Sequence, residues 1–325
     1  MNQSALIEKL GTSPLPWVRY NALKTFYNLP ASDRQLRQSY RELCSHPLLQ
    51  REITLCQQWP DPPLKSHKAA AHPLHHLPLL ADLGCTVRTP GVKAVVDAVL
   101  NHAADDGALQ SIVALPGIWG GSDTPEWLWM FCDAPVLLYA CLALGVPEND
   151  KIISKAFDHL AQLATAKKWC CVSSLEKLSG PGRRTDPCPY ATLLALRAFA
   201  RSPRYTTGSI CKGGTEVLLN HWDNRKKIKL RMFGIGTDFR KLKYPFIFYD
   251  ILHVVEVLSH FSWVRKDKRF KEMLRSITSK RDQEGMIIPE SVWMAFKGFD
   301  FAQKKEPSPM MTFLVERILQ RCTQD

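Results

Sequence analysis

Two adjacent arginines near the middle of the chain, Arg183 and Arg184, are the clearest candidates for binding an anion. They come just before Asp186 and an apolar run. A guanidinium group can bind phosphate oxygens through two parallel hydrogen bonds, and the free N–H groups at a helix start add to the attraction. The pair therefore indicates an anion site of the diphosphate type. The plain alternative is that both arginines are charges of a solvated loop.

Aromatic residues are frequent in the last third of the chain, and Tyr190 precedes them. Such rings can line a cavity for an apolar chain or stabilise a cation over their faces. The alternative is that they pack in the core, where large apolar side chains are usually found. The candidate cavity-lining residues are Tyr190, Tyr244, Tyr249, Trp293 and Phe299.

The net charge of +12 raises the question of an anionic partner, and its densest part lies between Arg225 and Lys271. Solvated loops between helices are one explanation. A hydrophobic small molecule that carries a diphosphate is another, and an anionic membrane surface or a protein partner stays open. Nucleic acid ranks last, because no recognition motif accompanies the basic clusters.

The ten cysteines are scattered singly except for Cys170 and Cys171, so we expect reduced thiols rather than a disulfide framework. The sequence has no uncharged apolar run of about 18 residues, and its first residues lack the layout of a signal peptide. These features predict a cytoplasmic protein.

The elements that must position these residues are helices that recur along the chain. Helix starts with Pro in or near the first turn are expected near Pro73, Pro135, Pro189, Pro245 and Pro309, a period of roughly 55 to 60 residues. Leu and Ala recur at helical spacing after each start, and no alternation typical of strands is visible. Gly84 and Gly145 fit helix stops. The sequence therefore predicts an all-α fold.

A second, amphipathic helix follows each of these starts, as at residues 92–104, 152–166 and 271–280. Asp105 and Asp106 fall where the turn after such a helix is needed, so a structural role is favoured for them. Helical hairpins of this kind suit a double-layered ring. We predict about five hairpins in one repeat domain over residues 66–325, preceded by an N-terminal helical cap over residues 1–65.

Degenerate turn motifs make the chain similar to the terpenoid cyclase and protein prenyltransferase superfamily, with its squalene-cyclase-like repeats. Repeats there end near Gln-x-x-Asp-Gly-x-Trp, and partial copies are Asp106-Gly107, Trp169 and Glu284-Gly285. The resemblance covers roughly Pro73 to Leu319 and implies an α/α toroid, of which this chain is a divergent member.

The resemblance also implies a zinc site. Protein prenyltransferase β subunits bind zinc through Asp-x-Cys at the start of an inner helix and through a His on the next inner helix. The matching residues here are Asp186, Cys188 and His253. Carboxylate, thiolate and imidazole are zinc ligands, and three of them leave a fourth position open. The alternative is a helix cap, a core thiol and a hydrogen-bonded histidine.

Function follows from the resemblance as an expectation. The Asp-x-Asp-Asp motif of the cyclases that protonate alkenes is absent, so their mechanism is not implied. We expect a divergent toroid enzyme that acts on a hydrophobic, isoprenoid-like substrate with zinc as cofactor. The alternative is a toroid that has lost the catalytic motifs and only binds a ligand or a protein.

Overall fold

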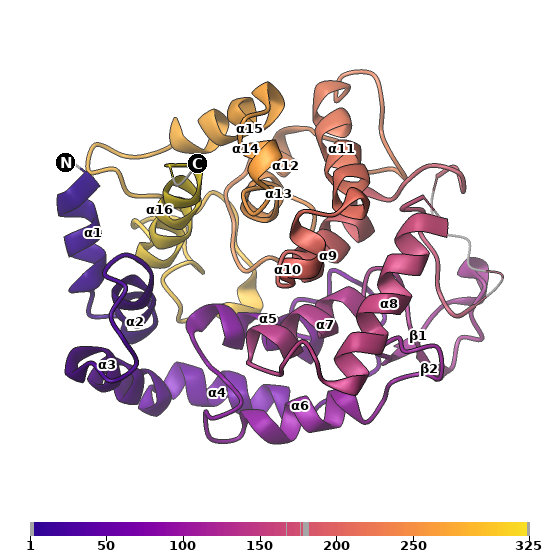
Figure 1. The fold of residues 1–325 in the computed structure, drawn as a ribbon, viewed down its shortest axis with the longest axis horizontal. Helices are drawn as coiled ribbons and strands as arrows, with labels where there is room; N and C mark the ends of the chain where they lie inside the picture. Colours follow the sequence, from indigo (N-terminus) through magenta and orange to yellow (C-terminus); the bar gives the residue numbers. More distant parts are fainter. Residues whose placement is uncertain (1–2, 167, 176, 178–181, 324–325) are drawn as a thin grey trace.

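The computed structural model describes residues 3–323 except 167, 176 and 178–181 (Figure 1). Most of these residues are helical, which confirms the prediction of an all-α class. The described part of the chain has one sheet, in which β1 (Ser111–Ala114) pairs antiparallel with β2 (Pro125–Leu128). No helix within the described ranges has the length and apolar character needed to cross a bilayer.

Six helices form a closed circuit of contacts. Each packs against the next one in the circuit, and the last, α16, packs against the first, α2. Figure 1 shows α16 beside α1 and α2, so the two ends of the described chain lie on the same side of the molecule. The circuit consists of α2 (Pro16–Thr25), α5 (Pro73–Leu83), α7 (Ala134–Ala143), α9 (Pro189–Phe199), α13 (Ile251–Leu258) and α16 (Pro309–Thr323).

A second set of helices packs on the circuit from outside. Helix α3 contacts α2, α4 contacts α5, α8 contacts α7, α11 contacts α9, α15 contacts α13, and α1 contacts α16. These outer helices bury one face; α15, for example, buries Phe270, Met273 and Ile277 at helical spacing. Their bounds are α1 Gln3–Gly11, α3 Arg34–Ser45, α4 Pro47–Cys56, α8 Lys151–Ala166, α11 Ser209–Asp223 and α15 Lys268–Thr278. The remaining helices are α6 (Val92–Leu100), the short α10 (Pro203–Thr206), α12 (Thr237–Arg240) and α14 (Ser262–Arg265), and the 3₁₀ turns η1 (Gly117–Trp119) and η2 (Met294–Phe296).

The predicted starts of the circuit helices are confirmed where proline stands in the first turn. Helices α5, α7 and α9 each have Pro at the first or second position. His72 caps α5 by accepting the N–H of Leu74, and Gly84 ends that helix with a φ of +108°. Helix α13 instead begins after Asp250, whose carboxylate accepts the N–H of His253.

The expectation that no strands are present is wrong at β1 and β2. Both strands have only four residues, which is too short for an alternating pattern to stand out from the sequence. The predicted helix over residues 92–104 also ends early, at Leu100. The chain then turns at Asp106, whose carboxylate accepts the N–H of Ala108, as the structural interpretation of that residue predicted.

A buried polar cluster joins the circuit helices inside the core. The carboxylate of Asp82 on α5 accepts hydrogen bonds from Tyr139 Oη at 2.7 Å, Arg197 Nη2 at 2.8 Å and Tyr244 Oη at 3.2 Å. These donors come from α7, α9 and the segment before α13. One carboxylate therefore connects α5 to α7, α9 and the segment before α13 through groups that are mostly shielded from water.

Candidate functional site

Three linker segments lie side by side where the chain enters α7 and α9. The N–H of Phe131 donates to Val172 O at 2.9 Å, and the N–H of Cys188 donates to Trp169 O at 2.8 Å. Isolated bridges pair Met130 with Ser173 and Cys170 with Pro187. The backbone thus holds residues 129–133, 169–174 and 185–188 together, which gathers Cys132, Cys171 and Cys188 at one cavity.

A fourth linker, before α5, brings His67 to the same place. Leu64 exchanges backbone hydrogen bonds with β1, donating to Ile112 O at 2.8 Å and accepting the N–H of Ala114 at 3.0 Å. A turn follows in which Ala69 N–H donates to Ser66 O at 2.9 Å. The short sheet therefore fixes the segment that carries His67, which is the part of the fold that the sequence pattern did not predict.

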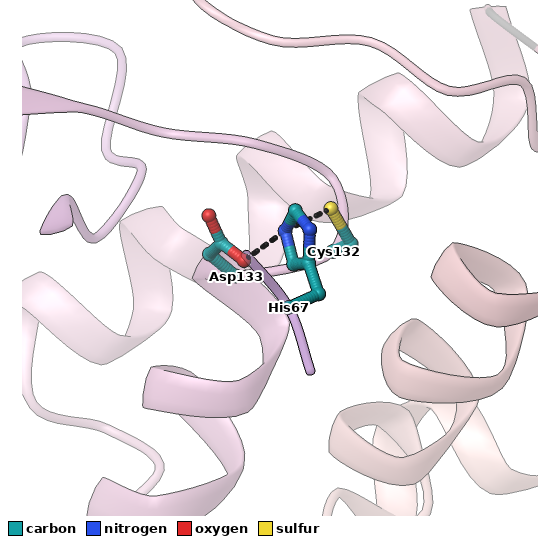
Figure 2. Close-up of side chains that lie close together, drawn as sticks. All are labelled: His67, Cys132 and Asp133. Atoms are coloured by element: carbon teal, nitrogen blue, oxygen red, sulfur yellow. Dashed lines mark hydrogen bonds and ion pairs between the residues drawn. The ribbon is translucent and has the colours of Figure 1, made fainter. Parts of the chain in front are cut away.

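His67, Cys132 and Asp133 form a compact group (Figure 2). Cys132 Sγ lies 2.9 Å from His67 Nε2, and Asp133 Oδ1 lies 2.7 Å from the same nitrogen. The three ligand atoms lie within 4.8 Å of one another, and no other group of three or more His, Cys, Asp or Glu in the described ranges meets this geometry for a metal ion. Asp133 is fully buried, and neither of its carboxylate oxygens receives a well-aligned hydrogen bond from a described residue.

Burial and charge act in opposite directions on this group. Burial lowers the pKa of His67, but the Asp133 carboxylate raises it by more, so the net pKa is above its ordinary value. Burial, and then the charge of Asp133, raise the pKa of the Cys132 thiol well above its usual range. Burial and the nearby carboxylate thus favour the neutral thiol of Cys132, and the same carboxylate favours the protonated form of His67.

This geometry differs from that of a catalytic triad. In a triad the acid holds one ring nitrogen of the histidine and the nucleophile faces the other. Here Cys132 and Asp133 both approach Nε2 of His67. One N–H cannot point at two acceptors, whereas three donor atoms that converge on one point can share a cation.

The cavity beside this group has a volume of about 330 Å³ and is mostly apolar. That volume lies at the lower end of the range for small-molecule sites, roughly 300 to 1,000 Å³. Val113, Trp119, Met130, Tyr190, Phe233 and Phe248 form its apolar wall. Lys65, Lys68 and Arg231 supply positive charge, and Lys68 Nζ lies 4.5 Å above the ring of Phe248.

A more polar groove of about 670 Å³ adjoins the cavity. Lys68, Arg231, Phe233 and Phe248 line both spaces. The groove adds Arg225 and Lys229 from the segment after α11, together with the carboxylate of Asp238. An apolar space thus opens beside a surface that is rich in positive charge.

No model of a protein family and no curated protein matches this chain.

The predicted zinc ligands Asp186, Cys188 and His253 do not form the kind of group found at His67. Cys188 is buried and lines the cavity. Asp186 is partly exposed, 4.0 Å from Arg183 Nε. His253 is fully buried on α13, where Nδ1 lies 3.0 Å from Phe248 O and the ring stacks on Phe246. This matches the alternative of a hydrogen-bonded histidine.

The other predicted site residues divide between cavity and core. Arg183 and Arg184 are exposed, and neither lines the cavity or the groove, although the Arg183 carbonyl accepts Arg231 Nη1 at 2.8 Å. Tyr190 lines the cavity, and Tyr249 lines the groove while it contacts His221. The rest line neither space: Tyr244 donates to Asp82, Trp293 lies under Lys243, and Phe299 packs on Trp17.

The sequence pattern did not indicate a role in the site for His67, Cys132, Cys171 or Arg231. Asp133 stands two residues before Pro135, where a helix start was expected. One signal was available: Cys132-Asp133 precedes Pro135 in the same way that Asp186-Pro-Cys188 precedes Pro189. His67 offered none, because it stands in a linker without periodic pattern.

Proposed function

We propose that this chain is a metal-dependent enzyme in which His67, Cys132 and Asp133 hold the ion at the wall of an apolar cavity. The observation that carries the proposal is the convergence of three different ligand atoms around one point, with a fully buried carboxylate that lacks well-aligned hydrogen-bond donors. Burying a carboxylate without such partners is costly, and a bound cation removes that cost.

The donor set favours zinc. Nitrogen, sulfur and carboxylate oxygen are the ligands that zinc takes in proteins, and three protein ligands leave one position for a substrate or water. When bound, zinc supplies a Lewis acid and lowers the pKa of a coordinated water or thiol. The apolar wall of the cavity would exclude bulk water from the open side.

The fold supports membership of the α/α toroid class that the sequence resembles. A closed circuit of six helices with an outer partner on each is the arrangement expected of a double-layered helical ring. The cavity is lined by linkers that precede α5, α7, α9 and α13. The N-termini of these helices carry partial positive charge, which favours anionic groups in this region.

The substrate class that fits best is an isoprenoid-like molecule, apolar with an anionic group at one end. The apolar wall would hold the chain of such a molecule. Lys68 and Arg231 stand between the cavity and the groove, where Arg225 and Lys229 add charge for a diphosphate. This anion site replaces the pair Arg183 and Arg184 in the proposal.

The decisive experiment measures zinc per chain by elemental analysis after purification without a polyhistidine tag. We expect near-stoichiometric zinc in the native chain, and an affinity weaker by at least about 10- to 100-fold in Cys132→Ala and Asp133→Asn. The matched controls Cys188→Ala and His253→Ala should keep the metal. If these two lose it while Cys132→Ala keeps it, the ligands are those of the resemblance, and a metal-free native chain overturns the proposal.

The same proteins separate an enzyme from a binding protein. The metal-loaded native chain and Cys132→Ala are compared for turnover of isoprenoid diphosphates in the presence of thiol acceptors. Turnover by the native chain alone supports the enzyme. Tight binding without turnover in either protein supports the non-catalytic alternative.

A further inference from the structure

Cys171 and Cys188 form a second pair of chemical groups at the cavity, separate from the three proposed ligands. Both line the cavity, and each thiol is the main influence on the pKa of the other. Their segments are held together by the bridge between Cys170 and Pro187 and by the hydrogen bond from Cys188 N–H to Trp169 O. The backbone therefore holds the two segments that carry these thiols side by side at the cavity.

The surroundings of the two sulfur atoms differ strongly. The hydrogen bond from Cys188 lowers the pKa of Cys171 most, and the buried guanidinium of Arg231 lowers it further. Its hydrogen bond to Cys171 and its burial raise the pKa of Cys188 well above the usual range. These surroundings favour the thiolate form at Cys171 over that at Cys188, and both residues line the cavity.

We propose that Cys171 and Cys188 are a redox-active dithiol that reacts with small-molecule disulfides entering the cavity. Cys171 attacks one sulfur of the disulfide, forms a mixed disulfide and releases one thiolate. Cys188 then loses its proton to solvent and attacks the sulfur of Cys171, which releases the second thiolate. The two protein thiols are oxidised to one disulfide, and the small disulfide is reduced to two thiols.

The neighbouring Cys170 provides the internal contrast. Like Cys171 it is partly exposed, but its thiol donates to Thr185 O at 3.5 Å, and burial raises its pKa. If exposure alone decided reactivity, Cys170 and Cys171 would react with a disulfide at similar rates. The arrangement around Cys171 predicts that it reacts with a disulfide about tenfold faster or more, since one pKa unit changes the thiolate fraction about tenfold.

The test exposes the full reduced chain to oxidised glutathione and follows it by intact mass and peptide mapping. The native chain should form an internal Cys171–Cys188 disulfide and retain no glutathione. Cys188→Ala should keep glutathione on Cys171, because the resolving thiol is missing. Cys171→Ala should form neither product, and Cys170→Ala should behave as the native chain does.

Two results would overturn the dithiol. One is an internal disulfide that persists in Cys171→Ala, and the other is loss of the Cys171–Cys188 disulfide in Cys170→Ala. Should Cys188→Ala fail to fold, Cys188→Ser keeps a hydrogen-bond donor at the start of α9 and is used instead. The inference needs no metal, and zinc measured on Cys171→Ala keeps a failure here distinct from a failure of the proposed metal site.

Discussion

Asp250 and His253 lie one turn apart at the start of α13, and burial shifts the pKa of each toward the neutral form. It raises the pKa of Asp250 from 3.8 to about 7, although Lys243 and two backbone N–H groups act in the other direction. It lowers the pKa of His253 from 6.5 to about 3, and the charge of Arg197 adds to that effect. Both groups are therefore neutral inside the folded chain over much of the acid range.

The two shifts predict opposite effects on stability. Asp250 stabilises the fold most below 3.8, and its contribution is lost as the pH rises to about 7. The contribution of neutral His253 is present above 6.5 and is lost as the pH falls toward 3. Relative to the native chain, Asp250→Asn should gain stability as the pH rises through this range, and His253→Asn should gain it as the pH falls.

Chemical denaturation at several pH values measures both differences. Asparagine at position 250 can still cap α13, so the comparison isolates the titration of the carboxyl group. A difference in the free energy of unfolding between variant and native chain that stays the same at every pH would contradict the pKa shifts of Asp250 and His253.

At the proposed metal site, only the helix start was predictable. A helix was expected to begin near Pro135, and α7 does begin there, directly after Asp133. Its contact with His67 was not predictable, because the two residues are 66 positions apart and the linker before α5 is held by a strand too short to recognise. Helical periodicity predicts where helices lie in the sequence, but it does not predict which linkers contact each other in the fold.

At the scale of helices, the buried Asp82 cluster makes α5 depend on its neighbours. Arg197 and Asp82 are each about 5% exposed, and they form an ion pair at 2.8 Å. Breaking a buried ion pair leaves an uncompensated charge, which typically costs about 3 to 5 kcal/mol. Asp82→Ala should therefore lower the free energy of unfolding by about that amount, measured by urea denaturation.

Two comparisons make this prediction specific. Asp97→Ala breaks the exposed ion pair with Lys93 on α6 and should cost less than about 1 kcal/mol. The double variant Asp82→Leu/Arg197→Met should recover part of the loss, because it buries no unpaired charge. If Asp82→Ala and Asp97→Ala lowered the free energy of unfolding equally, the buried Asp82 cluster would contribute no more than an exposed ion pair.

Helix starts were the best predicted feature at this scale. Pro in the first turn marked α5, α7 and α9 correctly, because that position lacks an intrahelical N–H partner in any case. The end of α6 was misplaced because the alanines after Leu100 continue an apolar pattern while the chain already turns. Beyond α6 the N–H of Ala104 donates to Ala108 O and that of Gln110 donates to His102 O, and the periodicity does not reveal these bonds.

For the whole molecule, the contact that holds the last helix of the circuit, α16, against α13 is the point to test. Glu256 on α13 accepts hydrogen bonds from Arg317 and Arg321 on α16, each at 3.1 Å. It is 5% exposed, so its loss leaves two partly buried guanidinium groups without that acceptor. Glu256→Ala should destabilise the chain by roughly 2 to 3 kcal/mol, less than a fully buried pair.

Hydrogen exchange shows where that destabilisation acts. Exchange should accelerate in α16 and in its neighbours α1 and α2, while α7 and α8 keep their protection. A uniform increase over all helices would mean that the contact supports the fold as a whole and not its closure.

The number of helices in the circuit was only partly predictable. About five hairpins were expected, whereas α2, which lies in the predicted cap over residues 1–65, also takes part in the circuit. Its buried residues include Trp17, Val18 and Leu23, which lack the Leu- and Ala-rich pattern of the other circuit helices. The repeat pattern therefore did not predict that α2 belongs to the circuit.

The linkers that precede α5, α7 and α9 supply most of the chemical groups of the cavity, while the helices supply the core. This separation has a consequence for how such a protein can change over time. Substitutions in the linkers can alter what the cavity binds without disturbing the packing of the helices. Substitutions in the helices, in turn, can change the core without changing the reactive groups. A library confined to residues 64–68, 113–119 and 230–233 should thus diversify ligand preference while most of its members still fold.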